Sequence, residues 1–210
     1  KSEVRDRTLS RSRALIRHCA NSIRATHRGD DAEAQALLQT ARDAAAEMVS
    51  EARQYPDVYH AGYTQDALKE LAEAHITRAI ICLEPLPTPE QLRVEEAAYL
   101  NGLAEAAGEL RRFALDALRR GDVNQAERLL GCMDDIYSVL VTVDFPDAIT
   151  NGLRRSTDLV RGVLERTRGD VTTAVRQEQM KTLLREFEQR IGMRGDAAKS
   201  VEVDESDSEW

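Results

Sequence analysis

Apolar positions recur every three or four residues through most of the chain, which is the period of amphipathic α-helices. Three breaks share an Arg-Gly-Asp string, at 28–30, 120–122 and 168–170, where glycine is expected to end one helix and aspartate to cap the next. With these breaks, the pattern predicts an all-α bundle of seven helices joined by short connections. The predicted helices cover approximately 3–28, 30–54, 65–83, 90–120, 122–143, 145–169 and 170–191.

Two segments depart from the helical pattern. The string PLPTP at 85–89 is too rich in proline for a helix interior and predicts a linker. Residues 193–210 are rich in Gly, Asp, Ser and Glu, a composition typical of disorder. The expected organisation is therefore one helical domain over 1–192, followed by a disordered acidic tail over 193–210.

Charge is unevenly distributed along the chain. The formal net charge is −8, yet residues 1–28 carry eight basic and two acidic side chains. Residues 193–210 carry two basic and six acidic side chains. A basic first helix favours contact with polyanions, of which nucleic acids are the commonest.

The three cysteines, Cys19, Cys82 and Cys132, are widely spaced and lie in apolar helical contexts. They are expected to be free buried thiols, which suits a reducing cytoplasm. No apolar run reaches the length of a membrane span, and no secretory signal opens the chain. We therefore expect a cytoplasmic protein with no membrane partner.

Two glutamate pairs at helical spacing are the main candidates for chemistry. Glu70 and Glu73 are three residues apart, and Glu105 and Glu109 are four apart, so each pair lies on one helix face. The helical neighbours of Glu105 include no lysine or arginine. Such pairs either form solvated faces or share a hard divalent cation, which prefers oxygen ligands. Spacing alone leaves both interpretations open.

Three strings carry a family resemblance: EARQYPDVYHAGYTQDALKELAEAHITRAI, YLNGLAEAAGELRRFALDALRRGD and FPDAITNGLRRSTDLVRGVLERTRGDV. In this order and over residues 3–192, the chain resembles the translin/Trax family, its archaeal members in particular. The resemblance implies a seven-helix bundle of the translin type that assembles into a closed, mostly octameric shell. It also implies binding of single-stranded RNA or DNA and, for Trax-type members, Mg²⁺-dependent endoribonuclease activity on single-stranded RNA.

The same resemblance assigns roles to the four glutamates. Glu70 and Glu73 match the E-x-x-E motif of Trax, and Glu105 and Glu109 match its D-x-x-x-E motif, with Glu in place of the more usual Asp at 105. All four are expected to be catalytic and to ligate Mg²⁺ or Mn²⁺.

Arginines are the candidates for contacts with RNA phosphates. The expected set lies on the first helix and on the helix that carries GLRRSTD: Arg17, Arg24, Arg28, Arg154, Arg155 and Arg161. Aromatic residues make up only 4% of the chain, so binding is expected to be electrostatic, without extensive base stacking. The alternative function is a non-catalytic translin-like binder of single-stranded RNA or DNA, which the Glu at 105 favours. A third hypothesis is that the chain is a helical scaffold or an obligate subunit of a larger complex.

Overall fold

The computed structural model describes the backbone of residues 1–204 and the side chains of residues 1–191. Within residues 1–204 it contains helices and no strand, which confirms the all-α prediction. The described chain has six long helices. Three short helices of four residues each lie in the connections between them. The long helices are α1 (Ser2–Arg28), α2 (Asp31–Ala52), α4 (Gly62–Ile81), α6 (Glu96–Arg119), α7 (Val123–Leu140) and α9 (Leu153–Asp204), and the short ones are α3 (Pro56–Tyr59), α5 (Pro89–Leu92) and α8 (Asp147–Thr150).

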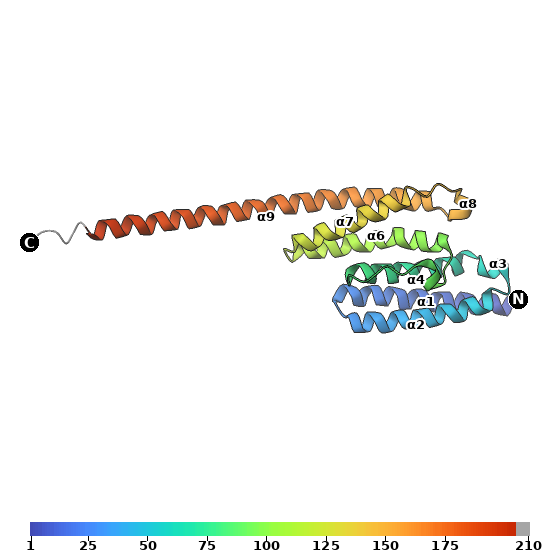
Figure 1. Cartoon of the computed structure of the whole chain (residues 1–210). Helices are drawn as coiled ribbons and strands as arrows, with labels where there is room; N and C mark the ends of the chain where they lie inside the picture. Colours follow the sequence, from blue (N-terminus) through green and yellow to red (C-terminus); the bar gives the residue numbers. More distant parts are fainter. Residues whose placement is uncertain (205–210) are drawn as a thin grey trace, which may run out of the picture.

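The long helices pack in layers (Figure 1). α1 and α2 form one outer layer, α4 and α6 lie in the middle, and α7 and α9 form the other outer layer. α1 contacts α4, α4 contacts α6, and α6 contacts both α7 and α9. α9 continues well past the end of the bundle (Figure 1). The two middle helices therefore lie between the two outer layers.

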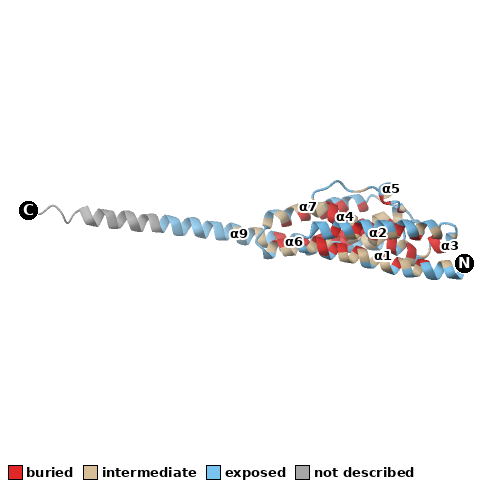
Figure 2. Cartoon of the chain, turned by 90° about the horizontal axis from the view of Figure 1, so that it is seen from below, coloured by how far each residue is buried: buried red, intermediate tan, exposed pale blue. Residues whose placement is uncertain are grey.

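The core is built largely from alanine and leucine. Buried positions concentrate where the helices face one another, and the outer faces are exposed (Figure 2). On α6, small buried residues such as Ala106, Ala107 and Ala114 alternate with Leu110 and Phe113. Small side chains at helix crossings let the backbones approach closely. This close approach decides which side chains of α4 and α6 meet.

The first two Arg-Gly-Asp strings behave as predicted. Gly29 and Gly121 adopt positive φ angles of 77° and 79°, the left-handed conformation that glycine adopts without strain. Asp30 and Asp122 then cap the following helices by accepting from the backbone N–H of Glu33 and Gln125. Each string ends one helix and begins the next.

The predicted break at Gly169 is wrong, because α9 continues through it. Buried positions recur on both sides of the glycine at Val160, Leu164, Thr167 and Val171, and they pack α9 against the bundle. A glycine inside a helix costs about 1 kcal/mol, which is less than these contacts contribute. The real break lies earlier, where Asn151 and Gly152 both have positive φ and separate α8 from α9.

The proline-rich segment 85–89 forms a linker, and its last residue begins the short helix α5 (Pro89–Leu92). Pro89 begins α5, and Thr88 caps it with a reciprocal pair of hydrogen bonds to Gln91. The predicted fourth helix is therefore two elements, α5 and α6, with Arg93 in the left-handed conformation between them.

The predicted acidic tail, 193–210, lies outside the residues whose side chains are described. The backbone of α9 is described as far as Asp204, and 205–210 lie beyond the description. The boundary at 192 and the disorder of the tail stay predictions. No helix in the described part of the chain is long and apolar enough to span a bilayer.

Candidate carboxylate site and nucleic-acid interface

Three of the four predicted glutamates converge between α4 and α6. One carboxylate oxygen from each of Glu70, Glu73 and Glu105 lies within 4.8 Å of the other two. Glu73 is 9% exposed, and Glu70 and Glu105 are half-buried. The two sequence motifs therefore form one cluster of acidic side chains, which we call the carboxylate site.

Gly102 permits this convergence. A Cβ atom at position 102 would lie 2.7 Å from the Lys69 carbonyl oxygen and 3.0 Å from the Glu73 backbone nitrogen. Both atoms belong to the backbone of α4, so no side-chain rotation relieves the clash. Only glycine lets α6 approach α4 this closely, one helical turn before Glu105.

Burial and neighbouring carboxylates raise the pKa of two of these glutamates, Glu70 and Glu73. Burial, followed by the charges of Glu70, Glu105 and Glu109, raises the pKa of Glu73 to about 8. Burial and the charge of Glu105 also raise the pKa of Glu70. The site therefore holds more negative charge than its cationic side chains balance. A bound cation would reduce the repulsion among the carboxylates.

Glu105 has one cationic partner. Lys69 Nζ donates to Glu105 Oε1 over 2.7 Å. Burial lowers the pKa of Lys69, but the hydrogen bond with Glu105 and the neighbouring carboxylate charges outweigh burial, and the pKa is raised overall. Lys69 is therefore a fixed positive charge at the edge of the carboxylate site.

Glu109 stands apart from the other three carboxylates and is held by α1. His27 Nε2 donates to Glu109 Oε2 over 2.6 Å, and the imidazole stacks on the Phe113 ring with 3.8 Å between ring centroids. The His27 side chain is 7% exposed, and its Nδ1 is buried with no hydrogen-bond partner. The last turn of α1 thus fixes the orientation of Glu109.

Sequence reasoning did not identify His27 as part of this site. Glu109 and His27 are 82 positions apart, and their contact depends on how α1 packs across the bundle. The same packing puts the buried thiol of Cys19 near Glu70 and Glu73, whose charges, after burial itself, raise its pKa. The only sequence signal was a histidine in the last turn of a helix, which occurs in many helices without function.

The predicted arginines form two separate groups. Arg17, Arg24 and Arg28 are exposed on α1, and Arg28 pairs with Glu33. Arg154, Arg155 and Arg161 are exposed on α9, in the opposite outer layer. Arg161 pairs with Asp158, and Arg154 lies 4.0 Å from Asp144. Within one subunit the two groups do not form a continuous surface.

Replacing Glu73 by Gln is expected to stabilise the metal-free protein at high pH. An acid whose folded pKa is raised costs no stability below its unfolded pKa and costs progressively more as the pH rises toward the folded value. For Glu73 this window runs from about pH 4.5 to about 8. At pH 8 the variant should gain about 4 kcal/mol, and at pH 4 almost nothing. Urea unfolding in EDTA at both pH values measures the gain, and an equal gain at both would contradict it.

Replacing His27 by Gln is expected to release Glu109 without removing a carboxylate. Gln lacks the ring that stacks on Phe113, so it cannot hold the same orientation. Loss of such a supporting contact commonly lowers metal affinity or activity about 10- to 100-fold. Titration of Mn²⁺ binding to His27→Gln, with His18→Gln as the matched histidine on the same helix, measures this loss. Equal Mn²⁺ affinity in both variants would show that Glu109 needs no support.

Comparisons with known proteins agree with one another. An uncharacterized protein of Methanocaldococcus jannaschii is 32% identical over 187 residues, which cover 88% of this chain and 82% of that protein. AfC3PO is similar in structure, both alone (39% identity, TM-score 0.76) and in complex with duplex RNA (38%, 0.77), and each match covers 82% of this chain and 90% of that one. NeC3PO without ligand matches at TM-score 0.76 over the same shares, but at 22% identity it shows the fold alone. No family model matches the chain.

Proposed function

Since the chain belongs to the translin/Trax family of C3PO-type proteins, we propose that it is a metal-dependent endoribonuclease that cuts single-stranded RNA as a homo-oligomer. One observation carries the proposal: three carboxylates meet within 4.8 Å, with one lysine to offset them. The similarity to AfC3PO, which binds duplex RNA, supports RNA as the ligand.

The residues of the carboxylate site suit Mg²⁺ or Mn²⁺. All donors are oxygens, the set that hard divalent cations prefer. The raised pKa values of Glu70 and Glu73 reflect repulsion and burial that a cation would offset. Glu70, Glu73 and Glu105 would hold the ion, and Glu109 lies close enough for its charge to act on Glu73. A divalent cation supplies Lewis-acid chemistry there, neutralising charge on phosphate oxygens and activating water.

Two neighbouring side chains orient this site. Lys69 holds the Glu105 carboxylate through a short hydrogen bond and keeps a positive charge at the edge of the carboxylate site. His27 contacts Glu109 through Nε2 while its ring stacks on Phe113, so the imidazole that orients this carboxylate is itself held in place. Both contacts limit the motion of acidic side chains that would otherwise repel one another.

RNA is proposed to bind through backbone phosphates. The proposed contacts are exposed arginines, and those that pair with an acid do so at the surface: Arg17, Arg24 and Arg28 on α1 and Arg154, Arg155 and Arg161 on α9. Because the two groups lie on opposite outer layers, copies of the chain packed together could present groups from different subunits to one strand. This geometry favours an assembly, and salt-sensitive binding follows from the phosphate contacts.

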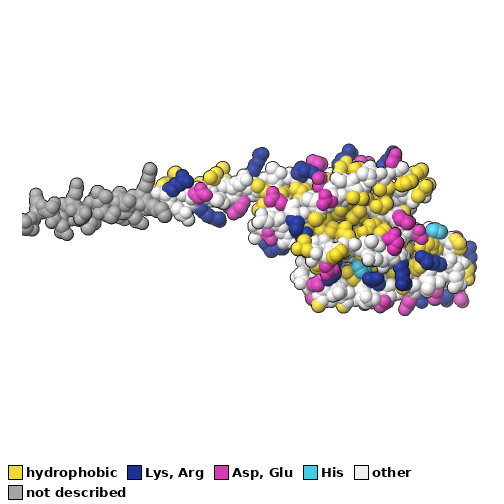
Figure 3. All heavy atoms as spheres, in the orientation of Figure 1, with side chains coloured by type: hydrophobic (Ala, Val, Ile, Leu, Met, Phe, Trp, Pro, Cys, Tyr) yellow, Lys and Arg dark blue, Asp and Glu magenta, His cyan; other side chains and the backbone are white. Residues whose placement is uncertain are grey.

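Self-association is supported by exposed apolar side chains. Four apolar side chains are each at least half exposed at the end of α7, in the connection that follows it and on α8: Val139, Val141, Phe145 and Ile149. Figure 3 shows apolar side chains gathered over the bundle on the side turned to the viewer. Contiguous apolar surface of this kind marks contact sites between proteins. We propose that copies of the chain associate through this surface into a closed shell, and that the shell is an octamer.

A non-catalytic binder of single-stranded RNA or DNA is the second candidate. Two of the four carboxylates already contact basic side chains of the protein: Glu105 pairs with Lys69, and Glu109 pairs with His27. A site with its charges satisfied in this way could be structural. The presence of Glu70 and Glu73 without a cationic partner of their own favours the nuclease.

The test is cleavage of end-labelled RNA in Mg²⁺, Mn²⁺ or EDTA. Single-stranded RNA, the corresponding duplex and single-stranded DNA form the three substrate arms. Cutting of the single strand in either metal and none in EDTA is expected. Tight RNA binding with no cutting in any metal would overturn the nuclease proposal in favour of a non-catalytic RNA-binding protein. Absence of RNA binding would overturn both proposals.

A further inference from the structure

A groove lies between α2 and α5, on the side of α4 that faces away from the carboxylate site. Leu68 of α4 lines it, whereas Glu70 and Glu73, at 100° per residue, point to the other side of that helix. The groove has a volume of about 490 Å³. Three of its lining residues are arginines, Arg42, Arg53 and Arg93, and we call it the arginine groove.

The three guanidinium groups have no acidic partner. Among the side chains that the structure describes, none of them forms an ion pair with a carboxylate, although Asp43 also lines the groove. Arg42 donates to the Gln91 carbonyl oxygen, and Arg53 lies over the Tyr59 ring at 5.7 Å. Asp43 accepts from Gln39 instead. Three guanidinium groups against one aspartate give the groove an excess of positive charge in a chain of net charge −8, which favours an anionic ligand. Arg53 and Arg93 also line a neighbouring hollow that contains glutamates, but they form no ion pair with them among the described side chains.

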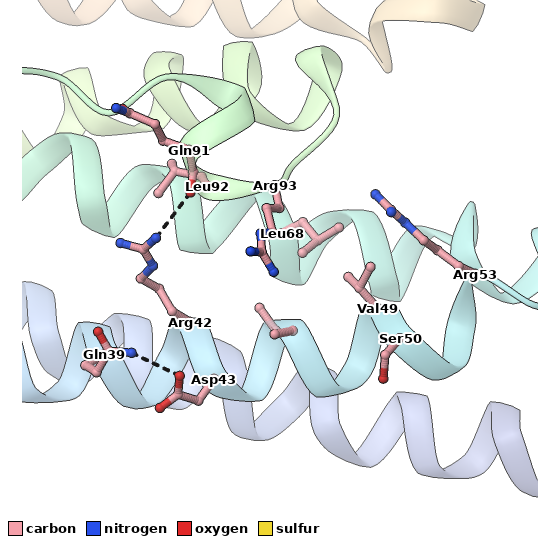
Figure 4. A pocket seen from close by; sticks show the side chains of 12 residues that line it. Gln39, Arg42, Asp43, Val49, Ser50, Arg53, Leu68, Gln91, Leu92 and Arg93 are labelled. Atoms are coloured by element: carbon pink, nitrogen blue, oxygen red, sulfur yellow. Dashed lines mark hydrogen bonds between the residues drawn. The ribbon is translucent and has the colours of Figure 1, made fainter.

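The backbone at Arg93 is held in an unfavourable conformation. Its φ angle is 57°, the left-handed region that an arginine rarely adopts. Strain of this kind persists where the surrounding structure imposes it, often at sites of function. In Figure 4, Arg93 descends from the end of α5 into the groove, and Arg42 and Arg53 rise from α2 on either side of it.

The groove is formed before any ligand arrives. The reciprocal hydrogen bonds of Thr88 and Gln91 fix α5, and the bond from Arg42 to Gln91 ties α5 to α2. Leu68, Leu92 and Val49 supply an apolar floor beneath the charged rim. A ligand that suits both surfaces has a flat, largely apolar part and a strongly anionic part.

We propose that the arginine groove binds a nucleoside monophosphate, either free or as the 5′-terminal nucleotide of an RNA strand. The phosphate would lie among the guanidinium groups, and the base on the apolar floor. A terminal phosphate carries more negative charge than an internal one, so it suits three cations better. The site goes beyond the proposed nuclease function, because none of the four glutamates takes part in it.

Arg93→Gly is the sharpest variant, since it removes one guanidinium and also relieves the left-handed strain, so the protein should fold at least as stably. Arg42→Gln removes a second cation. Arg119→Gln, an exposed arginine on α6 that pairs with Asp116, is the matched control. Thermal melting of all three checks that the fold is intact.

Calorimetry in EDTA measures binding of AMP, adenosine and inorganic phosphate, and no cleavage is involved. AMP should bind at least about tenfold more tightly than either fragment, and Arg93→Gly or Arg42→Gln should weaken it about tenfold or more. Fluorescence anisotropy with one RNA oligonucleotide bearing a 5′-phosphate or a 5′-hydroxyl separates the two sources. A preference for the 5′-phosphate that Arg93→Gly removes identifies the RNA end, and no preference identifies the free nucleotide.

Three results would overturn the proposal: no saturable AMP binding together with no 5′-phosphate preference, equal affinity for AMP and inorganic phosphate, or binding that the two arginine variants leave unchanged. Because every arm is run in EDTA, a failure of the nuclease assay has no bearing on this outcome.

Discussion

The double variant Glu73→Gln/Glu105→Gln should lose RNA cleavage by a factor on the order of a thousand. Gln keeps the size of each side chain and removes the charge, so the core around Glu73 stays filled. Two of the three converging carboxylates are then gone, and one remaining acid cannot hold a divalent cation firmly. A metal contributes several kcal/mol to charge stabilisation in phosphate chemistry, which corresponds to about three orders of magnitude in rate. Single-turnover cleavage of end-labelled RNA measures the loss.

RNA binding separates this result from unfolding. The arginines on α1 and α9 are untouched by the double variant, so its RNA affinity in EDTA should match that of the unmodified chain. Glu127→Gln, an exposed glutamate on α7, is the control and should cut at the full rate. If the double variant cut as fast as the control in Mg²⁺, the carboxylate site would have no part in catalysis.

The convergence of the acidic motifs could be predicted from sequence, but the surroundings of each acid could not. Spacing shows that Glu70 and Glu73 share a helix face, and the family resemblance pairs them with the second motif. The partners Lys69 and His27 depend on the crossing of α4 with α6 and on the packing of α1. A pattern within one helix carries no information about such crossings.

Helix ends show the same division between local and tertiary information. Gly29 and Gly121 end helices because the chain reverses there and needs a left-handed residue. Gly169 has the same neighbours in sequence, yet buried side chains before and after it hold α9 in one helix. The Arg-Gly-Asp string is the same at all three positions. Only the packing of the flanking residues decides whether the helix ends at the glycine.

Gly102→Ala should destabilise the bundle and separate the carboxylates at once. The added Cβ meets the Lys69 carbonyl oxygen at 2.7 Å, so α4 and α6 must move apart. Overpacking of this kind costs about 1–3 kcal/mol, even though alanine is the better helix former. Because Glu105 is one turn away, the shift also moves it from Glu70 and Glu73, and misplacement by about 1 Å can lower a rate about a hundredfold. Urea unfolding and the cleavage assay measure the two effects.

Gly108→Ala is the matched change on the same helix. Gly108 is exposed, and a Cβ there meets nothing within 4 Å. This variant should gain up to about 1 kcal/mol from helix propensity and cut RNA at the full rate. The two substitutions are chemically identical and differ only in the distance between helices, so a stability difference of about 2–4 kcal/mol between them reports that distance. Equal stability and equal cleavage in the two variants would mean that α4 and α6 do not need the close approach at Gly102.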